Sequence, residues 1–426
     1  MRVHLHNIGP IRDADIMLTP LTVLVGPNGT GKTTFTTVAY AAMQAHRVAM
    51  VDALEQLEGF DPGGTRRKRG PAMARDVIDQ WEESFAERLE FQLRRCCNPD
   101  LEKLGRAKRG GQNAAPRIEI ATDQWSLVFR LEGNELYLET DHRCYRPPRF
   151  ELSRGTSLPT ARAQVRKVLA LSMPKRGVYF PAGRSALVQT HSAMTALMAG
   201  AISGGYFENA TIGEIPGTVA DFMQMMARIK ANRRSRVRAG KLAKRIESEL
   251  LHGDVRLHER GGQKSFRFRP EGQKGEWALE NIATSIGEVS PLVLYLRHWA
   301  WPRDAILIDE PESHLHPEAQ APLAGALMDL SETISPTLVA THSELLVSAL
   351  SAELLDRTRA RKKGAVPPKL SVHEFKFHDE DRSYGVDVAE IEVEPTRGFQ
   401  VRRFAEVADE VFESGIDAYN RLHGSD

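Results

Sequence analysis

Two groups of residues, far apart in the sequence, combine residue types and spacings suited to a nucleoside triphosphate. Near the amino terminus, Gly26-Pro27-Asn28-Gly29-Thr30-Gly31-Lys32-Thr33 fits the P-loop pattern, in which glycines let backbone N–H groups surround phosphates. Far downstream, Asp309-Glu310 ends the apolar run Ala305-Ile306-Leu307-Ile308. A carboxylate pair at the end of a buried strand is costly unless it serves a cation. The two groups together predict a site for a triphosphate and Mg²⁺.

Each position of the first group has an expected role. Backbone amides from Asn28 to Thr34 would bind phosphates at the start of a helix, Lys32 would neutralise phosphate charge, and Thr33 would ligate Mg²⁺. The predicted nucleotide contacts are therefore Gly26, Pro27, Asn28, Gly29, Thr30, Gly31, Lys32, Thr33 and Thr34. The alternative, a glycine turn beside a surface lysine, leaves the apolar strand Leu21–Val25 before it unexplained.

The second group supplies the rest of the chemistry. Asp309 would hold Mg²⁺ through water, and Glu310 would polarise the attacking water. His342 follows another strand-like run and is expected to contact the γ-phosphate, so Lys32, Glu310 and His342 are the predicted catalytic residues. The alternatives are acids on a solvated loop and a structural histidine. Ser285 and Gly287 precede an apolar helix and predict an anion-binding helix end, with an ordinary helix cap as the alternative.

Composition limits the class of protein. The chain has 426 residues, a formal net charge of +1, 41% hydrophobic residues and 27% charged residues, as in a globular protein with one large composite domain or two. We find no apolar run of roughly 18 residues and no apolar region typical of a signal peptide. The three cysteines, Cys96, Cys97 and Cys144, offer neither a disulfide framework nor metal spacing. These features predict a cytoplasmic protein without a membrane partner.

The order of patterns predicts five segments. They are an amino-terminal lobe with the P-loop (1–60), a basic helical insertion with an antiparallel β segment (61–150), a helical insertion (151–254), a carboxy-terminal lobe (255–363), and a β-hairpin with a closing helix (364–426). Within them we expect a helix over 33–44 and another over 291–299, each next to one group of site residues. Basic loops at 66–69 and 106–109 are expected on the surface.

These motifs resemble the ABC-type ATPase heads of the bacterial OLD-like and RecF/SMC-like group. The match covers residues 1–45 and about 279–350, and Asp309-Glu310-Pro311-Glu312-Ser313-His314-Leu315-His316-Pro317 is similar to the Walker B and D-loop segment of that group. Tyr179-Phe180-Pro181-Ala182-Gly183-Arg184-Ser185 and Pro291-Leu292-Val293-Leu294-Tyr295-Leu296 look like segments of stand-alone anti-phage ATPases. Those relatives resemble the ATPase subunits of Septu and PARIS and the ATPase half of Gabija and OLD nucleases.

The resemblance implies an α/β fold, an ABC-type P-loop NTPase head with an antiparallel β subdomain and a helical insertion. It implies ATP and Mg²⁺ as ligands and a head-to-head dimer or higher homo-oligomer, in which Ser285 and Gly287 contact the ATP of the partner. It also implies a separately encoded effector such as a nuclease, since the chain after His342 is too short for a fused TOPRIM nuclease. Two features depart from the pattern: the signature is reduced to Thr284-Ser285-Ile286-Gly287-Glu288, and Gln44 lies too close to the P-loop for a Q-loop glutamine.

A basic run leaves a second function open. Residues 228–245 contain nine Lys and Arg side chains and no acid, which at helical spacing would put cations around much of a helix. Such a surface could bind double-stranded DNA through its phosphates, or could be a solvated or partner-docking face. The competing functions are therefore a defence ATPase that controls an effector and a RecF/SMC-like repair ATPase that clamps DNA. The acidic cluster 379–381 is expected to be a solvated turn. A transporter ATPase is disfavoured because the two triphosphate motifs lie so far apart.

Overall fold

The structure is a computed structural model of the whole chain. It describes residues 1–58, 70–105, 115–149, 157–190, 215–230, 237–260, 263–360, 368–378, 385–401, 412–414 and 416. Several predictions lie outside these residues: the basic loops at 66–69 and 106–109, the acidic cluster 379–381, Arg233, Arg234 and Arg236 of the basic run, and most of the closing helix.

The described strands form two sheets. The large sheet contains β1 Arg2–Ile8, β2 Ile11–Met17, β3 Leu21–Val25, β4 Arg117–Ala121, β5 Ser126–Glu132, β6 Glu135–Leu138, β7 Arg176–Phe180, β11 Asp304–Asp309, β12 Thr337–Thr341, β13 Leu370–Phe377 and β14 Val386–Ile391. The small sheet contains β8 Gly253–Arg260, β9 Gln263–Pro270 and β10 Trp277–Ala278. Across the large sheet the order is β6-β5-β4-β1-β2-β14-β13-β3-β12-β11-β7.

The large sheet has a parallel half and an antiparallel half. Neighbours in the series β13-β3-β12-β11-β7 pair in parallel, whereas neighbours in the series β6-β5-β4-β1-β2 pair antiparallel. β12 lies between β3 and β11 and is parallel to both. The carboxyl ends of these three strands therefore lie at the same edge of the sheet. Ligands of open α/β sheets bind at this kind of edge. The P-loop, Asp309-Glu310 and His342 follow these three strand ends.

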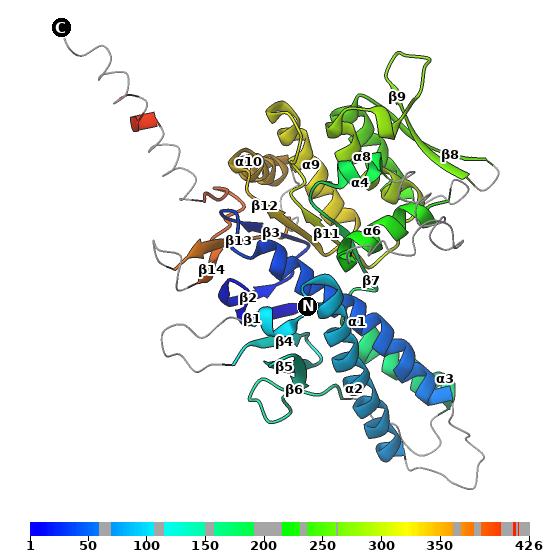
Figure 1. Cartoon of the computed structure of the whole chain (residues 1–426), viewed down its shortest axis with the longest axis vertical. Coiled ribbons are helices and arrows are strands. Elements are labelled where there is room, and N and C mark those ends of the chain that lie inside the picture. Colours follow the sequence, from blue (N-terminus) through cyan, green and yellow to red (C-terminus); the bar gives the residue numbers. More distant parts are fainter. Residues whose placement is uncertain are drawn as a thin grey trace, which may run out of the picture.

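Helices cover both faces of the parallel half (Figure 1). The first face packs against α1 Lys32–Glu58, and α2 Gly70–Cys96 and α3 Leu158–Val165 pack against α1. The second face packs against α4 Arg184–Gln189, α6 Gly217–Arg228, α7 Val237–Ile246, α8 Thr284–His298, α9 Pro317–Thr333 and α10 Glu344–Ala360. The fold is therefore α/β, and a P-loop connects β3 to α1 as in ABC-type P-loop ATPase heads.

Successive side chains of the buried strands point to opposite faces of the sheet, and each face has its own hydrophobic core. On β11, Ala305 and Leu307 join the core under α1 and α2, whereas Ile306 and Ile308 join the core under α8 and α9. A strand covered on both faces reads as a continuous apolar run. The predicted strands at both site motifs are confirmed for this reason, as are the two hairpins β1–β2 and β13–β14.

Two helices start or end differently from the prediction. α1 continues to Glu58 rather than ending near Gln44, because residues 32–58 contain no glycine or proline and the added turns pack along α2. α8 begins at Thr284 rather than Pro291, which lies inside the helix. Proline removes a helix hydrogen bond, and burial of most of α8 offsets that loss.

The basic run does not surround one helix, so this prediction was wrong. α6 ends at Arg228, and Ile229 leaves helical geometry with a ψ of 132°; the next described helix is α7. In α7 the side chains of Arg238 and Lys241 are exposed, while those of Leu242 and Ala243 are buried. The cations of α7 therefore lie on one face, because the other face is needed for the core.

Candidate nucleotide site

The glycine loop between β3 and α1 has a backbone that requires glycine at two positions. Gly26 has a φ of +142°, and a Cβ there would lie 2.4 Å from the carbonyl oxygen of Phe375 on β13. Gly31 has a φ of +92°, and a Cβ there would lie 2.8 Å from the side chains of Pro10 and Ile11. The loop is therefore held between β13 and the β1–β2 turn, while Pro27, Asn28 and Gly29 at its tip are exposed.

Lys32 folds back over the loop that precedes it. Its Nζ donates hydrogen bonds of 2.7 Å to the carbonyl oxygens of Gly26 and Pro27, and only 8% of the residue is exposed. Burial lowers the pKa of Lys32, and the nearby charges of Glu310, Asp309 and Glu312 act in the opposite direction. The ammonium group thus sits between the loop and the acids that follow β11.

Asp309 is the buried acid at the end of β11. Its Oδ2 accepts a 2.6 Å hydrogen bond from the Tyr179 hydroxyl, and the nearby Thr33 hydroxyl also lowers the pKa of this carboxylate. Burial raises the pKa of Asp309 to about 6, against the lowering effect of these two hydroxyls. Its Oδ1 is buried and has no hydrogen-bond partner among the described residues. Thr33 and Asp309 are thus adjacent, and a hydroxyl beside an unpaired carboxylate oxygen suits a hard cation such as Mg²⁺.

Glu310 leaves the strand in an unusual conformation. Its φ is +46°, its N–H donates to Ala340 O at 2.8 Å, and its Oε2 accepts from Ser313 at 3.0 Å. A non-glycine residue with positive φ carries strain, which is concentrated at functional sites. His342 lies beside it, with Nδ1 3.7 Å from Glu310 Oε1. The structure therefore brings Lys32, Thr33, Asp309, Glu310 and His342 to one edge of the sheet.

Glu312 is a site residue to which the sequence analysis gave no role. It is 5% exposed, and its Oε1 accepts hydrogen bonds from the Thr341 hydroxyl at 2.5 Å and from the backbone N–H of His342 at 3.3 Å. It therefore ties the end of β12 to the turn after β11 and fixes the backbone of His342. In the sequence, only its position two residues after Glu310 indicated that Glu312 belongs to the site.

The predicted signature lies at the start of α8. It connects to the backbone of Asp309 through Glu288 and Arg184. Gly287 is buried, and a Cβ there would lie 3.3 Å from Ser185 Cβ on α4, so this glycine permits close helix packing within the chain. Ser285 is half-buried. The next residue, Glu288, pairs with Arg184 at 3.1 Å, and both side chains are almost fully buried.

Arg184 joins two parts of the site. It donates to the carbonyl oxygens of Asp309 and Glu288, each at 2.9 Å, and to that of Pro181 at 3.1 Å. The start of α8 is thus rigidly linked to the end of β11. Sequence reasoning quoted Arg184 in a motif without giving it a role, because only the neighbouring position of β7 and β11 reveals the contact. Gln44 donates to Gly177 O at 3.1 Å, about 18 Å along α1 from Lys32.

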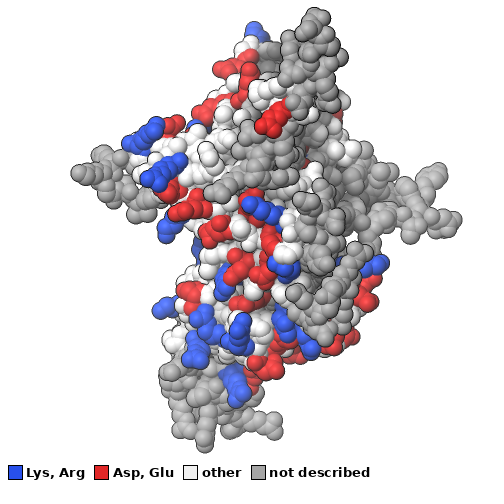
Figure 2. All heavy atoms as spheres, turned by 90° about the vertical axis from the view of Figure 1, so that its left-hand side faces the viewer, with Lys and Arg blue, Asp and Glu red and all other residues white. Residues whose placement is uncertain are grey.

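The described part of the basic run offers fewer free cations than its sequence indicates. Arg228, Lys230, Arg238, Lys241 and Lys244 are exposed. Arg245 pairs with Glu249 and Asp329. On another face of the molecule, Lys and Arg alternate with Asp and Glu over the described residues, without a wide area of one sign (Figure 2).

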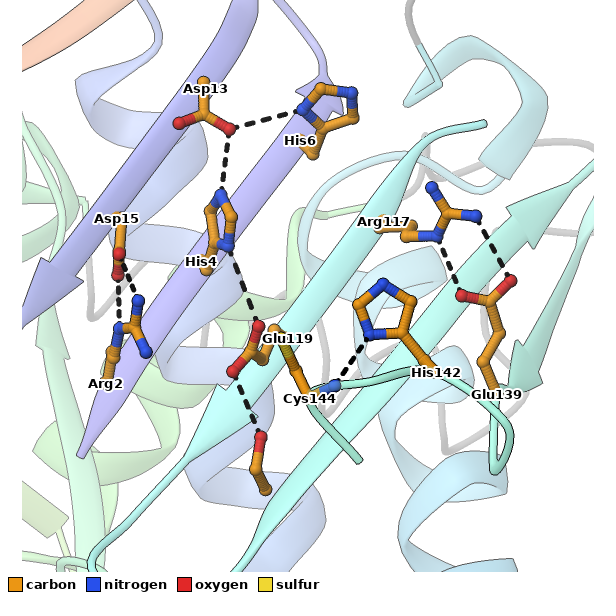
Figure 3. A network of polar contacts seen from close by, with 11 residues as sticks. Arg2, His4, His6, Asp13, Asp15, Arg117, Glu119, Glu139, His142 and Cys144 are labelled. Atoms are coloured by element: carbon orange, nitrogen blue, oxygen red, sulfur yellow. Dashed lines mark hydrogen bonds and ion pairs between the residues drawn. The ribbon is translucent and has the colours of Figure 1, made fainter. Parts of the chain in front are cut away.

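A second polar network lies on the antiparallel half of the sheet (Figure 3). His4 on β1 hydrogen-bonds Asp13 on β2 at 2.8 Å and lies 3.7 Å from Glu119 on β4. His6 also reaches Asp13, at 3.2 Å. Within the described ranges no group of three or more His, Cys, Asp or Glu side chains could hold a metal ion. This network therefore links the three strands β1, β2 and β4.

Comparison with protein families finds two matches. Residues 218–348 match the family described as "AAA domain, putative AbiEii toxin, Type IV TA system", and residues 2–37 match a family described as "AAA domain". The first match contains the end of β11 and His342, and the second contains the P-loop. The chain is thus similar to AAA-type ATPases at both motifs. No curated protein matches the sequence.

Similar solved structures are SMC head domains. The SMC head domain from Thermotoga maritima has 12% identity and a TM-score of 0.41, and the alignment covers 92% of this chain and 98% of that one. A Smc head domain bound to the C-terminal domain of ScpA, derived from Pyrococcus furiosus, has 11% identity and a TM-score of 0.45, with 96% and 98% covered. A SmcHead bound to the C-winged helix domain of ScpA has 12% identity and a TM-score of 0.45, with 92% and 97% covered. No residue role transfers at these values. In the described part of the chain, no helix has the length and apolarity needed to cross a bilayer.

Proposed function

We propose that this chain binds ATP with Mg²⁺ and hydrolyses it. The observation that carries the proposal is the adjacency of Thr33 and Asp309, two residues far apart in the sequence, with one buried carboxylate oxygen left unpaired. An unpaired buried oxygen costs free energy unless a ligand completes it. The glycine loop lies beside it, with Lys32 ready to exchange its carbonyl partners for phosphate oxygens.

Each site residue has a proposed role in ATP binding or hydrolysis. Thr33 and Asp309 would hold Mg²⁺, whose charge stabilises the transferring phosphoryl group. The amides of 28–34 and Lys32 bind and orient the triphosphate. Glu310, aimed by its strained backbone, accepts hydrogen bonds from the attacking water, and His342 contacts the γ-phosphate from the neighbouring strand end. Catalysis then arises from positioning and from charge stabilisation.

Two substitutions test the proposal. Lys32→Ala should abolish detectable ATP binding, because no other described cation contacts the loop carbonyls. Glu310→Gln should retain ATP binding and lower phosphate release by at least about 100-fold, since it removes general-base help. The measurements are nucleotide titration and phosphate release. ATP hydrolysis at the wild-type rate in both variants would rule out this site.

We further propose that the ATPase controls a separately encoded effector, such as a nuclease or toxin, in anti-phage defence. The support is the resemblance to stand-alone defence ATPases and the family description that names a toxin of a TA system. In this proposal ATP closes a head-to-head dimer or higher oligomer, and Ser285 of one copy contacts the ATP of the other. Gly287 is buried against Ser185, so its proposed role is to let α8 approach α4.

Purification of the Glu310→Gln chain from its native host would identify the effector. We expect one co-purifying nuclease or toxin, retained with ATP and lost in the Lys32→Ala chain. The second candidate, a DNA clamp, is favoured by the exposed cations on α7. If it is correct, Arg238→Glu with Lys241→Glu weakens duplex binding at low salt. Unchanged mobility shifts in that variant would remove the DNA clamp.

A further inference from the structure

A cavity lies at the opposite end of the parallel strands from the nucleotide site. It has a volume of about 690 Å³ and lies between α1, the turn after α3 and the first residues of β7 and β11. Asp304, in its lining, begins β11, whereas Asp309 ends it, about 16 Å away along the strand. The cavity therefore plays no part in the proposed chemistry.

The lining of this cavity is apolar and aromatic. Its apolar residues are Met50, Val51, Leu54, Ala170, Leu171, Pro174, Trp299 and Trp301. Leu171 is 60% exposed and Val51 is 51% exposed, which is unfavourable for large apolar side chains in water. Exposed apolar surface gathered around a cavity marks a binding site for another apolar surface.

The rim of the cavity is positively charged. Arg47, Arg166, Lys175 and Arg303 line it and are exposed. In the described part of the chain, none of these four side chains forms an ion pair with a carboxylate. Asp304 is the one acidic residue among the described lining residues. Arg176 and the Tyr295 hydroxyl already bind its carboxylate. The cavity, here called the cationic pocket, thus suits an occupant that is apolar and negatively charged.

Peptide fits this pocket better than nucleic acid. Arg176 already lies 4.8 Å from the ring centre of Trp299, and Lys175 lies 5.0 Å from that of Trp301, so one face of each indole is occupied. Stacking on open aromatic faces is what single strands require. The other apolar lining residues are aliphatic and are surrounded by cations, which favours apolar side chains with carboxylates around them.

The sequence of this chain contains such a segment at its carboxy terminus. Between Phe404 and Tyr419 it has five acids and no Lys or Arg: Glu406, Asp409, Glu410, Glu413 and Asp417. Its large apolar residues recur at helical spacing: Phe404, Val407, Val411, Phe412, Ile416 and Tyr419. Of these, Phe412 is 70% exposed and Ile416 is 45% exposed. An acidic segment with uncovered apolar side chains therefore complements the cationic pocket.

We propose that the segment 404–419 of one copy docks in the cationic pocket of a second copy. The segment follows Phe399, whose N–H donates to Ser351 on α10 at 2.9 Å. Figure 1 shows α10 and β14 on one side of the sheet and β7 with α1 and α3 on the other. Residues 402–403 span at most about 7 Å, so the segment begins on the side of the sheet away from the pocket of its own copy, which favours docking in a second copy.

Sedimentation of full-length chains without nucleotide tests this proposal. The pocket variant is Arg166→Glu with Lys175→Glu, and the tail variant is Glu413→Lys with Asp417→Lys. We expect the wild-type chain to self-associate and each variant to do so at least about 10-fold more weakly, because like charges then face each other. Combining both pairs of substitutions in one chain should restore association. The matched control, Arg238→Glu with Lys241→Glu on α7, should leave association unchanged.

Three results would overturn the proposal. The first is a wild-type chain that stays monomeric at every concentration. The second is association that neither variant weakens. The third is a labelled peptide of residues 402–426 that binds the wild-type and pocket-variant chains equally. Lys32→Ala should retain this association, so failure here leaves the proposed ATPase untouched, and failure of the ATPase leaves the docking intact.

Discussion

At the scale of residues, the hydroxyl of Tyr179 has the most consequence beyond the predicted motif positions. It lies on β7, beside β11, and holds one oxygen of Asp309. The second oxygen is left free for a cation. Loss of a group that orients a metal ligand typically lowers metal affinity about 10-fold to 100-fold.

Tyr179→Phe should therefore weaken the response to Mg²⁺. We expect the Mg²⁺ concentration for half-maximal ATP hydrolysis to rise about 10-fold to 100-fold. The hydroxyl also lowers the pKa of Asp309, so its loss raises that pKa and enlarges the effect between pH 6 and 7. Tyr40→Phe is the control, because its hydroxyl binds Asp221 at 2.7 Å instead. Equal Mg²⁺ dependence in wild type and Tyr179→Phe would remove this role.

Sequence reasoning reached the motif residues but missed their supporting contacts. The glycines, Lys32, Thr33 and the Asp309-Glu310 pair are visible because their chemistry needs fixed local spacing. Glu312, Tyr179 and Arg184 act through residues more than 20 positions away. Such contacts depend on the strand order, which the local pattern does not contain.

At the scale of elements, the buried pair of Arg184 and Glu288 connects α8 to the end of β11. A movement of α8 must therefore move the backbone of Asp309 or break this pair. In the proposed dimer, a contact made by Ser285 on α8 would reach the metal site of the same copy by this route. More than 100 residues separate β7 from β11 in the sequence, so local patterns do not predict this connection.

Arg184→Ala should destabilise the fold by about 3–5 kcal/mol, since Glu288 remains buried without its partner. Arg184→Lys keeps the charge but not the bonds to both carbonyls, so we expect a folded chain with slower ATP hydrolysis. Urea unfolding and phosphate release measure the two effects. Arg176→Lys is the matched control, because it disturbs the ion pair with Asp304 at the far end of β11. If both lysine variants hydrolyse ATP at the same rate, Arg184 is structural only.

At the scale of the molecule, two histidines make the free energy of unfolding depend on pH, one above pH 6.5 and the other below it. A hydrogen bond with Asp13 and an ion pair with Glu119 raise the pKa of His4 to about 9, above the usual 6.5 (Figure 3). This stabilisation is complete below pH 6.5 and is lost as the pH rises through 9. Burial among aromatic rings lowers the pKa of His46 to about 3. Its unfolded form takes up protons below pH 6.5, so stability falls there as well.

Taken alone, these two histidines make the free energy of unfolding largest near pH 6.5, whereas the raised pKa of Glu82, about 7 because of burial, acts against the effect of His46 below that pH. His4→Gln should flatten the decline between pH 6.5 and 9, by an amount on the order of 1 kcal/mol because Asp13 is largely exposed. Urea titrations at several pH values measure this. His378→Gln, at another histidine ion pair with Asp387, is the comparison. An unchanged alkaline decline in His4→Gln would assign that decline to other groups.

The central claim is that the glycine loop and the distant acidic strand end hold one Mg²⁺ between them. The most direct measurement is an experimental structure of the Glu310→Gln chain with ATP and Mg²⁺. The account predicts the metal bound by the Thr33 hydroxyl and a phosphate oxygen, with Asp309 in contact directly or through one water. A metal bound elsewhere, or a triphosphate that does not contact the amides of 28–34, would contradict it.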